Sequence, residues 1–186
     1  MKQKEKEADF SMKMFFTQLQ GLAKDIEDQE DIIEDAARLL AMSIVSDGSV
    51  YWYSEGEMDG IVTQAMTGDD GIPDSKRWSE AHSLSEQDTV VICSKWRDSV
   101  SASDVAKRAE EAGATVIGIT SAMSVSKDKH DWTTGAELLL VNGVSKGLIP
   151  SEDGETRIGT PHLLAGLHVY YTLFFVLRDI LDDQMA

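Results

Sequence analysis

The stretch that decides the fold runs from Asp88 to Ser121 and reads DTVVICSKWRDSVSASDVAKRAEEAGATVIGITS. It contains two apolar, β-branched runs, Thr89–Cys93 and Thr115–Thr120, in which apolar and polar residues do not alternate. Such runs are typical of parallel strands that are covered on both faces. The segment between them has helical composition, with Ser101 and an acid three residues later as a cap-like start and Gly113 as its stop. The stretch therefore predicts a β-α-β unit.

The remaining chain predicts further elements of the same α/β kind. Hydrophobic spacing indicates helices over 10–27 and 31–46, a strand over 50–53, a short helix that ends near Met66, a short strand over 76–78, a strand over 137–141 and a closing helix. Together they predict an α/β fold: a three-layer, Rossmann-like (flavodoxin-like) parallel sheet flanked by helices. We expect one domain over residues 1–186, with an N-terminal helical pair at about 10–46, the sheet core at 49–158 and a C-terminal helix at 160–182.

Composition and charge limit the classes of partner. The chain has 186 residues, of which 42% are hydrophobic and 27% charged, as is ordinary for a globular protein. The formal net charge of −16 argues against a nucleic-acid partner, which would need a basic face. The early run KQKEKE is not followed by a signal-peptide core, and the one cysteine, Cys93, cannot form an intrachain disulfide. These features favour a cytoplasmic protein.

The closing helix carries the strongest apolar signal in the chain. Its apolar part, Leu163 to Leu177, is shorter than the roughly 20 residues of a membrane span, and His168 interrupts it. We therefore expect no membrane partner. Because the helix is apolar nearly all round, most of its sides must be covered. We expect it to pack on the sheet and on a second copy of the chain, in a homodimer or a dimer of dimers.

Polar side chains follow both strands of the β-α-β unit, at the edge where open α/β sheets bind ligands. Hydroxyl groups, cations and the backbone N–H groups of a helix start can together bind an anion there. The residues concerned are Ser94, Lys95, Arg97 and Ser99 after the first strand, and Thr120, Ser121 and Ser124 after the second. The alternative is that Ser99, Ser101 and Ser103 only cap the helix, while the two cations form a solvated pair.

Three further side chains are candidates for chemistry. His162 is predicted in the first turn of the closing helix, as a general acid/base, a ligand contact or a structural histidine. Glu55 and Glu57 follow the first strand, and they either reach the mouth of the pocket or stabilise a helix start. No metal site is expected, since His82 and His130 lack the spacing of metal ligands.

Several of these segments resemble the SIS (sugar isomerase) domain family, with phosphoheptose isomerases as the nearest group. The run CSKWRDS at 93–99 lies where the family has a loop close to S-x-S-G-x-S, although it lacks the glycine and adds two cations. The turn SEGE at 54–57 lies at the family's glycine-rich turn. The run EEAGATVIGITS at 110–121 matches the AREKG-like and VITLTG-like segments of the family well. The run RIGTPH at 157–162 aligns with the segment that holds the isomerase histidine.

The resemblance implies a phosphorylated sugar as ligand, with no cofactor. It adds Ser54 and Gly56 to the ligand contacts and gives His162, reaching in from a neighbouring subunit, the acid/base role. The catalytic glutamate of the isomerases aligns with Ala65, so Glu55 or Glu57 would have to replace it.

Three functions remain open from the sequence. The first is a phosphosugar-binding protein without efficient catalysis. The second is an aldose–ketose sugar-phosphate isomerase that uses His162. The third is an interaction or structural protein that has kept the fold and lost the ligand.

Overall fold

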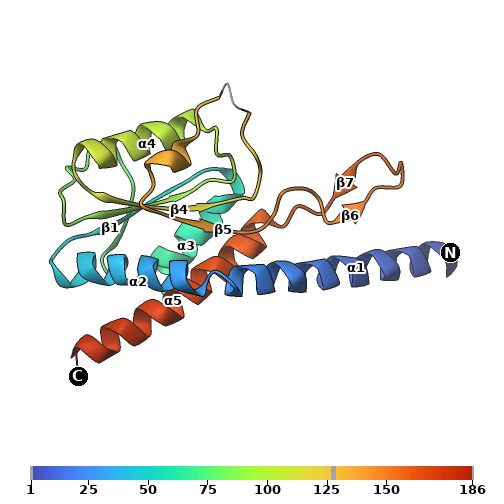
Figure 1. Ribbon diagram of the computed structural model, residues 1–186. Coiled ribbons are helices and arrows are strands. Elements are labelled where there is room, and N and C mark those ends of the chain that lie inside the picture. Colours follow the sequence, from blue (N-terminus) through green and yellow to red (C-terminus); the bar gives the residue numbers. More distant parts are fainter. Residues whose placement is uncertain (1, 127–128, 186) are drawn as a thin grey trace.

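A five-stranded parallel sheet forms the centre of the molecule (Figure 1). The computed structural model describes residues 2–126 and 129–185. The strand order is β2-β1-β3-β4-β5, with neighbours paired in parallel throughout, which is the flavodoxin-like order. The strands are β1 (Val50–Ser54), β2 (Ser75–Arg77), β3 (Thr89–Cys93), β4 (Thr115–Thr120) and β5 (Leu138–Val141). The predicted fold class is confirmed.

Helices cover both faces of this sheet, so the molecule has three layers (Figure 1). One face carries α4 (Val100–Glu111) and the short 3-10 turn η2 (Trp132–Gly135). The other carries α2 (Glu30–Val45), α3 (Asp59–Thr67) and α5 (His162–Met185), and a second short turn, η1 (Gly56–Met58), precedes α3. Apolar residues fill both interfaces, and buried Trp52 and Trp132 lie on opposite sides of the sheet.

The strands agree closely with the sequence prediction, because their apolar runs leave little choice of ends. β3 and β4 have the predicted limits, while β2 lies one residue earlier than expected and β1 includes Ser54. Gly113 ends α4 with a φ of 73°, a left-handed conformation that glycine adopts at little cost.

Two parts of the structure were not predicted. Helix α1 spans Lys2–Glu27, so it begins eight residues before the predicted start at Phe10. A two-stranded antiparallel hairpin, β6 (Ile149–Pro150) with β7 (Arg157–Ile158), extends beside the outer part of α1 (Figure 1). From the sequence, the hairpin region is only a loop rich in glycine and acidic residues, because strands of two residues show no hydrophobic periodicity.

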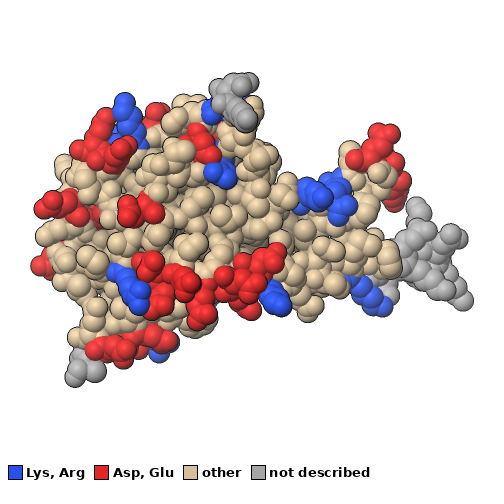
Figure 2. Space-filling model, viewed as in Figure 1, with Lys and Arg blue, Asp and Glu red and all other residues tan. Residues whose placement is uncertain are grey.

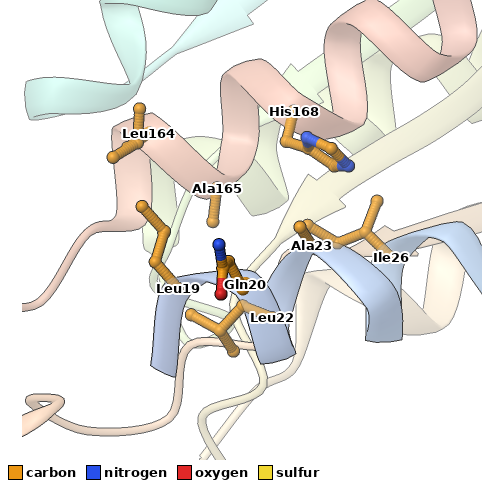
Figure 3. Close-up of a pocket in the computed structure, with 8 residues that line it drawn as sticks. All are labelled: Leu19, Gln20, Leu22, Ala23, Ile26, Leu164, Ala165 and His168. Carbon is orange, nitrogen blue, oxygen red and sulfur yellow. The ribbon is translucent and has the colours of Figure 1, made fainter. Parts of the chain in front are cut away.

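Helix α5 is long and apolar enough to span a membrane by length and composition, contrary to the sequence argument from length. It nevertheless contacts α1, α2 and α3, and its residues Ala165, Val169, Leu173 and Leu177 are buried in the core. An apolar pocket of about 220 Å³ lies between α5 and α1 (Figure 3), lined by Leu19, Gln20, Leu22, Ala23, Ile26, Leu164, Ala165 and His168. One side of α5 therefore packs in this fold, while Leu164 and Phe175 on the same helix are 48% and 56% exposed.

Candidate functional site

The predicted site residues gather where β1 and β3 end side by side. Ser54 and Cys93 are register partners at the carboxyl ends of the two strands. The chain leaves β1 toward one edge of the sheet and β3 toward the other, so this is the point where the strand order reverses. Loops at such a point diverge and leave a crevice, the usual ligand site of open α/β sheets.

One carboxylate links the two loops that leave β1 and β3. Glu55 Oε2 accepts a hydrogen bond from the hydroxyl of Ser94 at 2.6 Å, and Oε1 accepts one from Ser99 at 2.6 Å. The phenol of Tyr53 donates a third to Oε1 at 3.0 Å. Burial and the nearby charge of Glu55 raise the pKa of Tyr53 to about 12, which keeps this phenol a donor. The hydroxyls predicted to bind an external anion therefore already hold an internal one.

Ser99 also begins helix α4. Its side chain accepts a hydrogen bond from the backbone N–H of Ala102 at 3.1 Å, so Ser99, and not Ser101, is the N-cap. Its hydroxyl proton can then point at Glu55. The carboxylate thus lies at the N-terminus of a 12-residue helix, where the helix dipole favours negative charge.

Both cations of the β3–α4 loop have carboxylate partners. Lys95 Nζ lies 2.6 Å from Glu57 Oε1 and 5.1 Å from the ring centre of Trp96. Arg97 donates to Asp131 Oδ2 at 2.7 Å and to the hydroxyl of Thr133 at 2.9 Å. Each cation is therefore paired with a carboxylate, and the two do not form the solvated pair of the alternative interpretation.

The ion pair of Arg97 is the more structural of the two. Burial alone would raise the pKa of Asp131, but hydrogen bonds from Thr133 and Arg97 hold it below its usual value. The backbone N–H of Trp132 donates to the carbonyl of Arg97 at 3.0 Å, and its indole N–H donates to Trp96 O at 2.9 Å. Arg97 thus fixes the β3–α4 loop to η2.

Two buried polar atoms at this edge have no hydrogen-bond partner among the described residues. They are Thr120 Oγ1, at the end of β4, and Nδ1 of His162, the first residue of α5. His162 is only 4% exposed, and its backbone carbonyl accepts from the Asn142 amide at 3.3 Å. Burial lowers the pKa of His162, the positive charge of Lys95 lowers it further and Glu57 opposes them. A neutral imidazole therefore lies near the Lys95–Glu57 pair.

The other predicted ligand residues are engaged within the protein or lie at its surface. Ser54 donates to Asp59 at 2.6 Å, and Ser121 donates to the carbonyl of Lys95 at 2.7 Å. Gly56 is exposed with a φ of 56°, and Ser124 is exposed in the segment after β4. Ala65 is buried in the core on α3, so nothing at that position could act as a base.

Several residues of the site were not predicted as such: Tyr53, Asp131, Thr133 and Asn142. Asp131 follows Arg97 by 34 residues, and the sequence alone gave no sign that the two would pair. Among the described residues, no group of three or more His, Cys, Asp or Glu side chains is placed to hold a metal ion.

The general field of the molecule does not favour an anion. Acidic side chains gather over α2 and the end of α5 (Figure 2). The acids that are at least partly exposed on these two segments are Glu30, Asp31, Glu34, Asp35, Asp179, Asp182 and Asp183. An anionic ligand would therefore depend on local donors, such as those that hold Glu55.

Solved structures share this fold at low sequence identity. Phosphoheptose isomerase GmhA from Neisseria gonorrhoeae aligns with a TM-score of 0.58 and 14% identity, over 97% of this chain and 99% of that one. The sugar isomerase domain of the RpiR transcription factor from Sphaerobacter thermophilus aligns with a TM-score of 0.55 and 17% identity, over 89% and 94%. The Vibrio vulnificus NanR protein complexed with ManNAc-6P aligns with a TM-score of 0.61 and 13% identity, over 95% of this chain and 62% of that one. At this identity the likeness concerns the fold, which is that of sugar isomerase domains.

Sequence comparison gives a closer relationship. The uncharacterized protein YwjG of Bacillus subtilis (strain 168) is 34% identical over 174 residues, which are 92% of this chain and 98% of that protein. A family model described as "Domain of unknown function (DUF2529)" matches residues 12–181. With a sugar-isomerase-like fold and a family match over most of its length, the chain belongs to the DUF2529 family.

Proposed function

We propose that this protein binds a phosphorylated sugar at the carboxyl ends of β1, β3 and β4, without efficient isomerisation. In this proposal the phosphate accepts hydrogen bonds from the hydroxyls of Ser94 and Ser99, and the sugar extends toward His162 and Thr120. The loop after β4 would line the same edge.

One observation carries the proposal: two serine hydroxyls converge on a single carboxylate at the start of α4. A phosphate oxygen and a carboxylate oxygen accept hydrogen bonds of the same kind, so the loop has the donor geometry that a phosphate requires. Nδ1 of His162 and Oγ1 of Thr120, which are buried and have no hydrogen-bond partner in the described part of the chain, add two groups that a sugar hydroxyl could satisfy. The complex of NanR with ManNAc-6P supports a ligand of this class on the same fold.

Isomerisation is the second candidate, and His162 is the observation that favours it. A neutral, buried imidazole whose Nδ1 has no partner among the described residues can accept a proton from a bound substrate. The reaction also needs a second acid/base group on the other side of the substrate. Ala65 is inert, Glu55 is held by three hydroxyls and Glu57 pairs with Lys95, so we expect little turnover.

The test is calorimetric titration of the protein with sugar phosphates, such as sedoheptulose 7-phosphate and glucose 6-phosphate, and with the same sugars lacking phosphate. Phosphorylated sugars should bind and raise the melting temperature, because a ligand of the native state stabilises it by mass action. Ser94→Ala should weaken binding by about tenfold, the loss of one hydrogen bond to a charged group. The matched control is Ser83→Ala, at an exposed serine in the loop before β3.

Binding of no sugar phosphate, or equal binding of the unphosphorylated sugars, would contradict the proposal and favour an interaction protein that has lost the ligand. Turnover of sedoheptulose 7-phosphate that His162→Ala abolishes would instead establish the isomerase.

A further inference from the structure

The anion seat, defined as the hydroxyls of Ser94 and Ser99 at the start of α4, is occupied by a part of the protein itself. Glu55 places one carboxylate oxygen on each hydroxyl, both at 2.6 Å. The backbone fixes this arrangement, since the N–H of Glu55 donates to the carbonyl of Cys93 at 3.2 Å and extends the β1–β3 pairing by one residue. A carboxylate with one oxygen on each hydroxyl fills the positions that two phosphate oxygens would take.

We propose that Glu55 is an internal competitor for the anion seat, so that an anionic ligand binds only by displacing its carboxylate. This inference rests on the proposed function for the identity of the ligand, and it adds a residue that sets the affinity and specificity of the site. A weak anion does not displace Glu55, whereas a sugar phosphate adds contacts through its sugar that offset the cost.

Glu55 has a short path out of the seat. It is half-buried, and the next residue, Gly56, is exposed, with no described atom beyond its chain neighbours within 4 Å of where a Cβ would lie. Because Glu55 is half-buried, we expect rotation about its side-chain bonds to carry the carboxylate to water while the backbone of β1 stays in place. The phenol of Tyr53, which now donates to Glu55, becomes available when the carboxylate leaves.

Charge makes the competition strong. A phosphate that entered with Glu55 in place would meet its negative charge directly, because the carboxylate lies on both hydroxyls. Like charges at such short range disfavour joint occupation. Removal of Glu55 alone should therefore raise the affinity for a simple anion.

The experiment is calorimetric titration with inorganic phosphate at fixed pH and ionic strength. Glu55→Ala should bind phosphate at least about tenfold more tightly than the unmodified protein, because the seat is vacant and one repelling charge is gone. The control Glu86→Ala removes the same charge from an exposed position just before β3, at the amino ends of the strands and therefore away from the anion seat. This variant should bind phosphate as the unmodified protein does. Adding Ser94→Ala to Glu55→Ala should abolish the gain.

Glu55→Gln keeps the length of the side chain and serves as a second variant if the alanine variant fails to fold; its affinity should change in the same direction. Equal phosphate affinity in the unmodified protein and the Glu55 variants, or an equal gain in Glu86→Ala, would overturn the inference.

Glucose 6-phosphate separates this inference from the proposed function. If the Glu55 variants gain phosphate affinity but neither they nor the unmodified protein bind any sugar phosphate, the competitor role stands and the proposed function fails. If the unmodified protein binds sugar phosphates and the Glu55 variants bind phosphate no better, the proposed function stands and the competitor role fails.

Discussion

The side-chain amide of Gln29 pairs with the backbone of Val141 on the edge strand β5. Its Nε2 donates to the carbonyl of Val141 at 2.8 Å, and its Oε1 accepts from the N–H of the same residue at 3.0 Å. Gln29 lies at the break between α1 and α2, where its own carbonyl accepts from the N–H of Ile33. One residue thus joins the start of a helix to the open edge of the sheet and protects that edge from pairing with another chain.

Gln29→Ala should lower the free energy of unfolding by about 1 to 3 kcal/mol, because two backbone groups of Val141 lose their partner in a half-buried place. Urea denaturation, monitored by circular dichroism, measures the free energy of unfolding of the variant. The control Gln18→Ala, at an exposed position on α1, should change stability by less than about 0.5 kcal/mol. Equal effects of the two substitutions would contradict a role for Gln29 at the edge of β5.

Substitution of Arg97 and of Lys95 should have different effects on stability and on ligand binding, although both cations lie in the same loop. Arg97→Ala leaves Asp131 without its cation and releases the loop from η2, so we expect a loss of about 1 to 3 kcal/mol. Lys95→Ala should cost less than about 1 kcal/mol, because its pair with Glu57 is more exposed. Its main effect should be weaker binding of sugar phosphates. Thermal melts of both variants measure stability, and calorimetric titration measures binding. Equal destabilisation by the two substitutions would contradict a mainly structural role for Arg97 and a mainly binding role for Lys95.

His162 should make stability depend on pH. Its pKa in the folded protein is lowered, mainly by burial and then by Lys95, so the unfolded chain binds the proton more tightly. The stabilisation is complete above the unfolded pKa of about 6.5 and is lost as pH falls through the lower, folded value. His162→Gln should flatten this part of the stability profile in urea melts between about pH 5 and 7. The exposed His130→Gln should leave the profile unchanged, and a profile that His162→Gln does not alter would remove burial of this imidazole as its cause.

The sheet could be read from the sequence because it is built from local patterns. β3 and β4 are unbroken apolar runs, and Gly113 marks the end of the helix between them. The start of α1 could not be predicted, since the charged residues that open the chain have no apolar periodicity. The β6–β7 hairpin depends on close backbone contact, because a side chain at Gly147 would meet the backbone of Arg157.

Only part of the candidate site could be predicted from the sequence, and none of its contacts. Parallel strands bring their carboxyl ends to one edge, which correctly placed Ser94, Ser99 and Glu55 near each other. Nothing in their spacing shows that both serines donate to the same carboxylate, because 39 and 44 residues separate them from Glu55. The partners of Lys95 and Arg97 are likewise fixed by the paths of other loops.

The outer part of α1 carries an apolar surface that supports the expected homodimer. Phe10 and Phe16 are 65% and 55% exposed, and this part of α1 extends beyond the sheet together with the β6–β7 hairpin (Figure 1). Clusters of exposed apolar side chains mark interaction surfaces in soluble proteins. We therefore expect a dimer at tens of micromolar in sedimentation velocity, and a monomer once Phe10→Ser and Phe16→Ser are combined.

The matched control for assembly is Met42→Ser, on α2, where an apolar side chain is 62% exposed away from the outer part of α1. It should leave the dimer intact, because Met42 lies on α2, outside the proposed interface. If the outer part of α1 forms the interface, the double variant should dissociate without loss of helix content by circular dichroism, since both phenylalanines lie outside the core. An unmodified protein that sediments as a monomer would refute the assembly, and dissociation by Met42→Ser alone would move the interface to α2.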